Sequence, residues 1–405
     1  MEHRPVLVAL RGLGMGGLLT AVPALRGLRR AYPGHRILLA APAALSGLLP
    51  LMDAVDALLD VSGPGPVPYD RPDIAVNLHG GGPRSTLALL RTRPGRLLTH
   101  AHPGVPHAGG PPWDPEPDEV TRWCALLGWY GVPADPADLS LPVPPATAAG
   151  HVIVHPGAAS PARRWPPERF AQVVAALGRA GHRVLLTGGP AERALALRVA
   201  ALARASGSPV AEVAAGRTDV AALAELVGAA RLVVCGDTGV AHLATALGTP
   251  SVVLFGPASP ARGGRPRRDR HIALWAGRTG DPHGLVPDPG LLEIGVPEVL
   301  EAVLTLLAAD AGRAGDGDGA RPETRDGPGA RREEADGPVT VTLCEDGPLL
   351  VRGPFTIVTQ DGRTVDQGRA AVALCRCGRS AIKPFCDGSH KTTGFRAPGA
   401  PGEGT

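Results

Sequence analysis

The chain has 405 residues, enough for two or three domains that each bury a core without disulfide or metal staples. Its 41 basic and 38 acidic residues leave a formal net charge of +3, which argues against a dominant basic face for nucleic acid and against an acidic tail. The N-terminal apolar run is too short for a signal peptide, and no stretch of about eighteen apolar residues occurs. The composition therefore predicts a soluble, cytoplasmic protein with small-molecule partners and no transmembrane segment.

Lysine and cysteine both have an informative distribution. The two lysines, Lys383 and Lys391, lie near the C-terminus, so an anion site earlier in the chain must use arginine, histidine or backbone N–H groups. Six cysteines are too few for a disulfide scaffold, and three of them fall within residues 375–386, a pattern typical of a metal or cluster site in a reducing compartment. Cys124 and Cys235 lie in apolar surroundings and are predicted to be core residues.

The first domain is predicted to span residues 1–147. Its apolar runs alternate between the strand period and the helix period, which is typical of a βαβ unit. The predicted strands are 5–10, 36–40 and 74–78, and the predicted helix is 18–31. The run LPVPPATAA at 141–149 is rich in proline and alanine and has no periodicity, so it is interpreted as an interdomain linker.

A second α/β domain is predicted over residues 148–309. Its predicted strands are 151–155, 183–187, 232–235 and 251–255, and its predicted helices are 167–180, 190–205 and 220–229. Strands that alternate with helices predict a parallel sheet covered on both faces. Two such Rossmann-like domains in tandem predict a ligand cleft between the carboxyl ends of their strands.

The composition then changes abruptly. Residues 310–337 contain no valine, isoleucine, leucine or aromatic residue and are predicted to be a disordered linker. Short β-like runs resume afterwards and are separated by Asp-Gly turns. They are 339–343, 349–352 and 355–359, and they predict a small β-rich domain over residues 338–397.

Residues 375–390 read CRCGRSAIKPFCDGSH and bring three thiols and one imidazole into a short segment. The predicted ligands are Cys375, Cys377, Cys386 and His390. This set suits a [2Fe–2S] cluster with mixed ligation. A structural zinc site is the alternative, although zinc-binding cysteine pairs usually have about two to four intervening residues rather than one. The run resembles the CDGSH iron–sulfur (mitoNEET-like) family, and the match includes Ser380 and Pro384 as well as Asp387 to Ser389.

The resemblance to the CDGSH family implies electron transfer, redox sensing or cluster donation, usually by a dimer or by a chain with two motifs. This chain has one motif, so a homodimer through the C-terminal domain is expected. The neutral imidazole of His390 is expected to raise the reduction potential above that of an all-cysteine cluster and to make the cluster labile to acid. The partner that receives electrons or the cluster is not specified.

After the first predicted strand, Gly12, Gly14 and Gly17 form the pattern G-x-G-x-x-G. The pattern invites a dinucleotide-binding interpretation, but the acidic residue expected about twenty residues later at the end of the second strand is missing. The next acidic residue is Asp53, well beyond that strand. Binding of NAD is therefore disfavoured.

Four sequence blocks in the two α/β domains carry a second resemblance. They are RGLGMGGLLTAVPALRGLRRAYP at 11–33, HPGAASPARRWPPERF at 155–170, TGGPAE at 187–192 and GDTGVAHLATALGTPSVVLFGP at 236–257. Their content and order are similar to glycosyltransferase family 9, which includes the ADP-heptose heptosyltransferases. The resemblance implies a GT-B fold, a nucleotide-sugar donor held mainly by the second domain, and inverting, metal-independent transfer of a sugar such as heptose to an unspecified acceptor.

The same resemblance implies substrate-binding roles for residues of the second domain. They are Arg163, Arg164, Glu192, Asp237, Thr238, Gly239 and His242. Asp237 to Gly239 follow a predicted buried strand and open a helix, whose N–H groups and dipole suit a diphosphate, with simple N-capping as the alternative. Arg164 matches the family's phosphate-binding basic position, and Arg163 is beside it. Glu192 matches an acid that contacts the nucleoside, although a solvated helix residue fits equally well.

One position departs from the family pattern. Where the family has the aspartate proposed to deprotonate the acceptor hydroxyl, this chain has Gly17, and loss of a general base typically costs about 10²–10⁴-fold in rate. His79, expected at the cleft end of a first-domain strand, is the predicted substitute, although a hydrogen-bonded loop histidine is the commoner situation. Two functions stay open: a glycosyltransferase fused to a [2Fe–2S] domain, and a redox or cluster-transfer protein with a catalytically degenerate glycosyltransferase scaffold.

Overall fold

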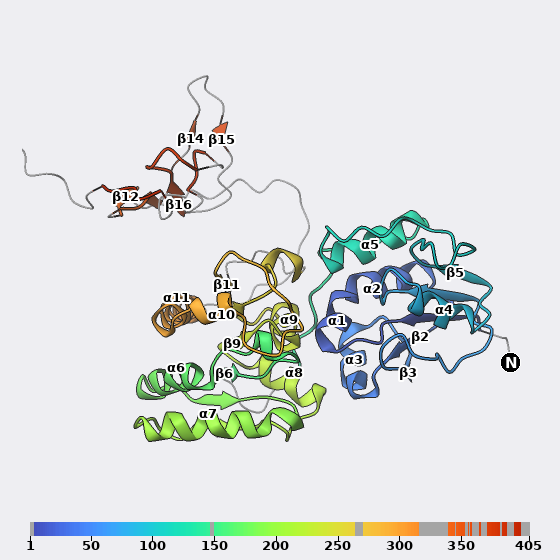
Figure 1. Cartoon of the computed structure of the whole chain (residues 1–405), viewed down its shortest axis with the longest axis horizontal. Coiled ribbons are helices and arrows are strands. Elements are labelled where there is room, and N and C mark those ends of the chain that lie inside the picture. The colour runs from blue at the N-terminus through green and yellow to red at the C-terminus, as the bar shows by residue number, and fades with distance from the viewer. Residues whose placement is uncertain are drawn as a thin grey trace, which may run out of the picture. The chain divides into compact units, whose positions relative to one another are not determined.

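The computed structural model describes residues 4–145, 150–263 and 270–315, together with shorter C-terminal stretches. Those stretches are 339–344, 346–352, 355, 357–358, 364–365, 371–380, 383–386 and 393–397. The chain divides into two compact units, Met1–Gly319 and Ala320–Thr405 (Figure 1). None of the described helices is both long and apolar enough to cross a lipid bilayer.

The first sheet has five parallel strands in the order β3-β2-β1-β4-β5. Its strands are β1 (Val6–Leu10), β2 (Arg36–Ala41), β3 (Ala57–Asp60), β4 (Ile74–Asn77) and β5 (Arg96–Leu98). The accompanying helices are α1 (Met15–Thr20), α2 (Val22–Ala31), the 3₁₀ helix η1 (Ala43–Leu48), α3 (Leu49–Met52), α4 (Arg84–Leu90) and α5 (Glu119–Trp129). All five residues of β1 are buried, as expected for a central strand of a parallel sheet whose two faces are both covered.

The prediction of one helix over 18–31 is wrong, because the chain forms two helices that meet at Ala21. Pro23 occupies the first turn of α2. A proline has no backbone N–H and its ring clashes with the carbonyl four residues earlier, so α1 cannot continue through this position, whereas a new helix can start there.

The second sheet has six parallel strands in the order β11-β10-β9-β6-β7-β8. Its strands are β6 (Val152–His155), β7 (Val184–Leu186), β8 (Glu212–Val213), β9 (Leu232–Gly236), β10 (Ser251–Phe255) and β11 (His271–Trp275). Its α-helices are α6 (Pro167–Arg179), α7 (Arg193–Ala205), α8 (Val220–Gly228), α9 (Gly239–Leu247), α10 (Pro289–Glu293) and α11 (Val296–Gly315). Three 3₁₀ helices, η2 (Pro161–Arg163), η3 (Pro190–Glu192) and η4 (Pro260–Gly263), occur in the loops.

The two sheets of this unit share a hydrophobic core. Leu18 of α1, Trp123 of α5 and Leu243 of α9 are buried in the same cluster. The helices α1 and α9 approach closely because Gly16 and Gly239 lack side chains: a Cβ added at Gly16 would lie 3.3 Å from the Cα of Gly239. The glycine-rich loop therefore packs one half of the unit against the other.

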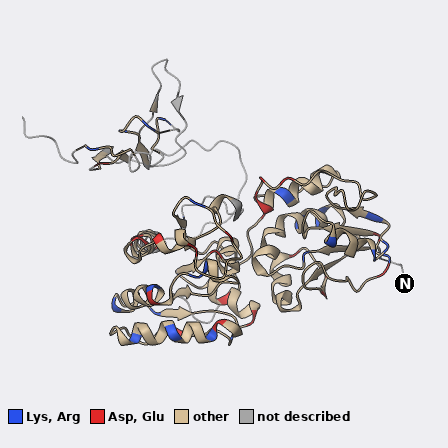
Figure 2. Cartoon of the chain, in the orientation of Figure 1, with Lys and Arg blue, Asp and Glu red and all other residues tan. Residues whose placement is uncertain are grey.

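The outer helices of the second sheet carry charged residues (Figure 2): α6 contains Glu168, Arg169 and Arg179, and the charged residues of α7 are all arginines. Arg198 of α7 pairs with Glu168 of α6, with Nη2 and Oε1 2.5 Å apart. Helix α11 continues to Gly315, past the predicted start of the linker at residue 310. Its last turns contain several alanines, which have the highest helix propensity, so the helix extends where the lack of large apolar residues predicted none.

The C-terminal unit contains small antiparallel sheets. One has the order β12-β13-β16 and the other pairs β14 with β15. The strands are β12 (Thr340–Leu343), β13 (Leu349–Arg352), β14 (Ile357–Val358), β15 (Thr364–Val365) and β16 (Ala371–Leu374). The predicted fold class, two parallel α/β sheets followed by a small β-rich region, is confirmed.

Candidate functional site

A cleft of about 1210 Å³ lies where the loops of the two parallel sheets face one another. Loops at the carboxyl ends of parallel strands commonly form ligand sites. From the side of the first sheet the cleft is lined by Leu13, Gly14, Met15, Gly16, Gly17, Thr20, Glu119 and Arg122. From the side of the second sheet it is lined by His155, Arg163, Gly188, Gly189, Glu192, Asp237, Thr238, Gly239, Val240, His242, Ser259 and His283, among others.

The junction between β9 and α9 forms one wall of this cleft. Gly236 ends the buried strand, Thr238 is the N-cap and α9 begins at Gly239. The Thr238 side chain makes no capping hydrogen bond, and its Oγ1 is buried with no hydrogen-bond partner among the described residues. The first-turn N–H groups and the positive end of the helix dipole therefore lie at the cleft, and the threonine hydroxyl is not used for capping.

Arg163 is held beside this helix start, and its neighbour Arg164 is not. Arg163 Nη1 lies 3.8 Å from Asp237 Oδ2, and Arg163 Nε is buried without a hydrogen-bond partner among the described residues. Arg164 donates from Nε to the carbonyl of Ala158 over 2.9 Å and is not one of the residues that line the cleft. Of the two predicted arginines, the structure brings only Arg163 to the helix start.

Glu192 lies at the end of η3, where its Oε2 accepts a hydrogen bond from the N–H of Gly189 over 2.8 Å. The same oxygen is 3.7 Å from Nε2 of His155, the last residue of β6. Burial lowers the pKa of His155, and the charge of Glu192 opposes that shift. His155 was not predicted as a site residue, although a histidine that ends a buried strand in an α/β domain is a signal that could have been used.

The opposite wall carries an ion pair that the sequence analysis did not predict. Arg11 has no exposed surface, and its Nη2 lies 2.5 Å from Oε2 of Glu119 at the start of α5. The same guanidinium donates to the carbonyls of Gly17 and Leu78, each over 2.7 Å, and to Thr20 Oγ1 over 2.9 Å. Burial lowers the pKa of Arg11 and the Glu119 charge raises it. Glu119 lines the cleft beside Gly17.

His79 lies just after β4, as predicted, but it is not among the residues that line the cleft. Its Nδ1 is buried without a hydrogen-bond partner among the described residues. Burial lowers the pKa of His79, the charge of Arg11 lowers it further, and Glu119 raises it. The structure therefore places His79 near the Arg11–Glu119 pair and apart from the cleft wall.

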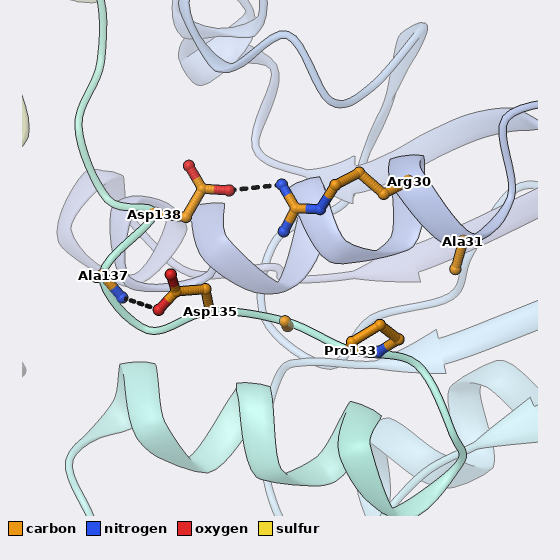
Figure 3. A pocket seen from close by; sticks show the side chains of 7 residues that line it. Arg30, Ala31, Pro133, Asp135, Ala137 and Asp138 are labelled. Carbon is orange, nitrogen blue, oxygen red and sulfur yellow. Dashed lines mark hydrogen bonds and ion pairs between the residues drawn. The ribbon is translucent and has the colours of Figure 1, made fainter. Parts of the chain in front are cut away.

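A second depression lies between the C-terminal part of α2 and residues 133–138, and Figure 3 shows its polar groups turned toward one another. Arg30 Nη1 pairs with Asp138 Oδ2 over 2.7 Å, and Asp135 Oδ1 accepts from the N–H of Ala137 over 2.9 Å. These contacts hold the segment after α5 against α2. Because its charges are already paired, this depression is a poorer ligand site than the cleft.

In the C-terminal unit, Sγ of Cys375 and Sγ of Cys377 are 3.8 Å apart. Backbone N–H groups of residues 378–380, foremost that of Ser380, lower the pKa of the Cys375 thiol. The segment with Cys386 pairs beside the first cysteine, since the N–H of Cys375 donates to Pro384 O and the N–H of Cys386 donates to Ala373 O. Within the described stretches no group of three candidate metal ligands is gathered, and His390 lies outside them.

Comparison with known proteins matches both parts of the chain to families. Residues 135–283 match the model of glycosyltransferase family 9 (heptosyltransferase), and residues 346–391 match the iron-binding zinc finger of CDGSH type. One segment of the chain thus resembles glycosyltransferase family 9, and another resembles the CDGSH type. Both resemblances noted in the sequence are thereby confirmed.

The curated relatives that the chain matches are heptosyltransferases. The chain is 33% identical over 127 residues to lipopolysaccharide heptosyltransferase 3 of Escherichia coli, covering 31% of this chain and 37% of the relative. It is 32% identical over 106 residues to lipopolysaccharide heptosyltransferase 2 of Salmonella typhimurium, covering 26% of this chain and 30% of the relative. The chain thus matches about a third of the length of each relative.

Solved structures extend the likeness in fold to both parallel sheets. A family 9 glycosyl transferase from Veillonella parvula matches with a TM-score of 0.62 and 21% identity, covering 76% of this chain and 99% of that one. The ADP-heptose heptosyltransferase II of E. coli matches with a TM-score of 0.61 and 21% identity, with the same coverage of each chain. The likeness in fold therefore includes the first sheet as well as residues 135–283.

Proposed function

We propose that the α/β unit is a glycosyltransferase that moves a sugar, of the heptose class, from a nucleotide-sugar donor to an acceptor hydroxyl with inversion at the anomeric carbon. The proposal rests on two buried polar atoms on one wall of the cleft, Arg163 Nε and Thr238 Oγ1, which have no hydrogen-bond partner in the part of the chain that the structure describes. Buried polar groups are normally hydrogen-bonded, so two such atoms beside a helix N-terminus point to a polar ligand.

The donor fits this wall by its charge. A nucleoside diphosphate carries negative charge that increases as the bond to the sugar breaks. Arg163 and the first-turn N–H groups of α9 would offset that charge, so no metal ion is needed. Asp237 orients Arg163. His242, which belongs to α9, lines the cleft. Glu192 is proposed to contact the nucleoside, and Arg164 to support the loop through Ala158 rather than the phosphates directly.

The acceptor is proposed to approach from the wall formed by the glycine-rich loop and α5. In this geometry the acceptor hydroxyl attacks the anomeric carbon from the face opposite the diphosphate, which inverts the configuration. The predicted division into domains at 1–147, 148–309, 310–337 and 338–397 places donor and acceptor walls on different domains, as the GT-B architecture requires.

We also propose that Cys375, Cys377, Cys386 and His390 hold a [2Fe–2S] cluster. The 3.8 Å between Sγ of Cys375 and Sγ of Cys377 fits this, because two sulfur ligands of one tetrahedral ion with bonds of about 2.3 Å are about 3.8 Å apart. Backbone N–H groups that lower the pKa of Cys375 favour the thiolate that ligation requires. Such a cluster would supply one-electron redox chemistry, and a homodimer through the C-terminal unit would provide two of them.

The transferase proposal is tested with the purified full-length chain. Binding of ADP-2-deoxy-2-fluoro heptose is measured by calorimetry, and release of ADP from ADP-heptose is measured with and without heptose-deficient lipopolysaccharide as acceptor. GDP- and UDP-activated sugars serve as matched donors. Binding with acceptor-dependent release of a nucleoside diphosphate supports the proposal, and binding with no release under any condition would favour a degenerate scaffold.

The cluster proposal is tested on the same sample by absorption and electron paramagnetic resonance spectra and by iron, sulfide and zinc content. We expect about two irons and two sulfides per chain and loss of both in Cys377→Ser. Cys344→Ser is the matched control, since Cys344 is not one of the predicted ligands. Zinc in place of iron would contradict the cluster. Light scattering of the full chain would reveal the dimer.

A further inference from the structure

Glu119 stands on the wall of the cleft that faces the proposed donor site. Its side chain is 36% exposed, and its two oxygens differ. Oε2 accepts hydrogen bonds from Arg11 Nη2 over 2.5 Å and from Thr20 Oγ1 over 2.8 Å. Oε1 has no hydrogen-bond partner among the described residues. One oxygen is thus fixed by buried groups, while the other is available to a ligand in the cleft.

The Glu119 carboxylate lies close to Gly17, the position at which the chain lacks an acidic side chain. A Cβ added at residue 17 would lie 3.4 Å from Arg11 Nη2, which is the nitrogen that holds Glu119. Arg11 Nε also donates to the Gly17 carbonyl over 2.7 Å. Residue 17 and the Glu119 carboxylate therefore both contact the Arg11 guanidinium. Helix α5 thus places an acidic side chain beside the glycine-rich loop, which has none of its own.

We propose that Glu119 is the general base of the transfer reaction, an inference that rests on the proposed transferase function. The acceptor O–H bond breaks and its proton moves to Oε1 of Glu119. The acceptor oxygen forms a bond to the anomeric carbon of the donor sugar. The bond from that carbon to the diphosphate oxygen breaks, and its electron pair leaves with the nucleoside diphosphate beside Arg163.

Arg11 and Thr20 act as positioning residues in this scheme. They fix Oε2, which restricts rotation of the carboxylate and leaves Oε1 as the proton acceptor. Glu119 lines the cleft and has an oxygen available to a ligand. His79 does not line the cleft, and its Nδ1 is buried. A base must come within hydrogen-bond reach of the proton it removes, so the geometry favours the carboxylate over the imidazole.

The experiment compares full-length wild type with E119Q, using ADP-heptose as donor and heptose-deficient lipopolysaccharide as acceptor. Glutamine keeps the shape and can still accept from Arg11, but it cannot take up a proton at neutral pH. We expect the rate to fall about 10²–10⁴-fold while the affinity for ADP-2-deoxy-2-fluoro heptose stays unchanged. E116Q is the matched control, because Glu116 precedes the same helix, is exposed and does not line the cleft.

Rescue distinguishes a base from a structural carboxylate. In E119A the rate should rise when formate, a small carboxylate that can enter the space left behind, is added to the assay, whereas added chloride should have no such effect. A wild type that transfers and an E119Q variant that transfers equally fast would overturn the assignment of Glu119 and leave the transferase function standing. Loss of rate in H79A alone would give the role to His79.

Two further results are decisive. A wild type that binds the donor analogue but transfers to no acceptor would overturn the transferase function and this inference with it. An E119Q variant that loses the analogue and the rate together, without rescue of E119A by formate, would make Glu119 a structural partner of Arg11 and would overturn only the inference.

Discussion

The two walls of the cleft are assembled from the sequence in different ways. On the donor wall, Asp237, Thr238 and Gly239 are consecutive and lie where a buried strand meets a helix. On the facing wall, Glu119 contacts Arg11 and Thr20, which precede it by 108 and 99 residues. A local motif can be identified from its letters, whereas a contact over such a distance exists only after folding.

After E119Q, the largest effect is expected on the donor wall, where Arg163→Ala removes the charge beside the helix start. Loss of a preorganised charge aimed at the leaving group should lower kcat/KM about 10²–10³-fold. Arg164→Ala is the matched control, because that guanidinium bonds the Ala158 carbonyl and does not line the cleft. Steady-state rates of ADP release measure both. An equal loss in the two variants would contradict the separation of their roles.

The facing wall is probed by Arg11→Met, which removes a fully buried cation and its four hydrogen bonds. Removing this buried cation takes a hydrogen-bond donor from two carbonyls and from a partly exposed carboxylate, so the free energy of unfolding should fall by about 3 kcal/mol. Chemical denaturation followed by circular dichroism measures it. In the control Arg93→Met, the lost ion pair with Asp70 is exposed on both sides, and little change is expected.

Part of the fold could be predicted from the sequence alone. The parallel sheets followed from the spacing of apolar runs, and β10 and β13 begin and end where predicted. Short strands such as β3 and β5 were missed, because a few half-buried residues give no clear period.

The candidate site divides in the same way. The Asp237 motif was found because neighbours in sequence are neighbours in space, and the structure brings Arg163, Glu192, Asp237, Thr238, Gly239 and His242 to one cleft. Nothing near Glu119 in the sequence indicates its contact with Arg11. A lone acid at the start of a helix suggests only a favourable helix dipole interaction. The acceptor wall therefore required tertiary structure.

A carboxylate introduced into the glycine-rich loop tests whether an acid at position 17 can replace the one that α5 supplies. Gly17→Asp alone should crowd the loop, since its Cβ would lie 2.7 Å from Leu13 Cβ, and should lower the melting temperature. Introduced into E119Q, the new acid would lie near Arg11 and should restore the transfer rate at least about tenfold. No restoration, in a double variant that still binds the donor analogue, would show that position 17 cannot replace Glu119.

The smallest effect is expected from histidines whose pKa is lowered by burial, which occur beside both parallel sheets. Burial lowers the pKa of His79 and His100 beside the first sheet and of His151 and His155 in the second. The folded state keeps these imidazoles neutral, while the unfolded chain takes up protons below its ordinary pKa of about 6.5. The contribution of these histidines to the free energy of unfolding should therefore be largest above this pH and decrease as the pH falls below it.

His151 is the best residue for testing this dependence, because it lies outside the cleft and its Nε2 contacts the Leu226 carbonyl over 2.9 Å. His151→Gln keeps a donor for that carbonyl and removes one titrating group. The melting temperature should then fall less between about pH 7.5 and pH 5.5 than it does in wild type. His107→Gln removes an exposed imidazole and serves as the control. An unchanged slope in His151→Gln would assign the acid sensitivity to the other three histidines, two beside the first sheet and one in the second.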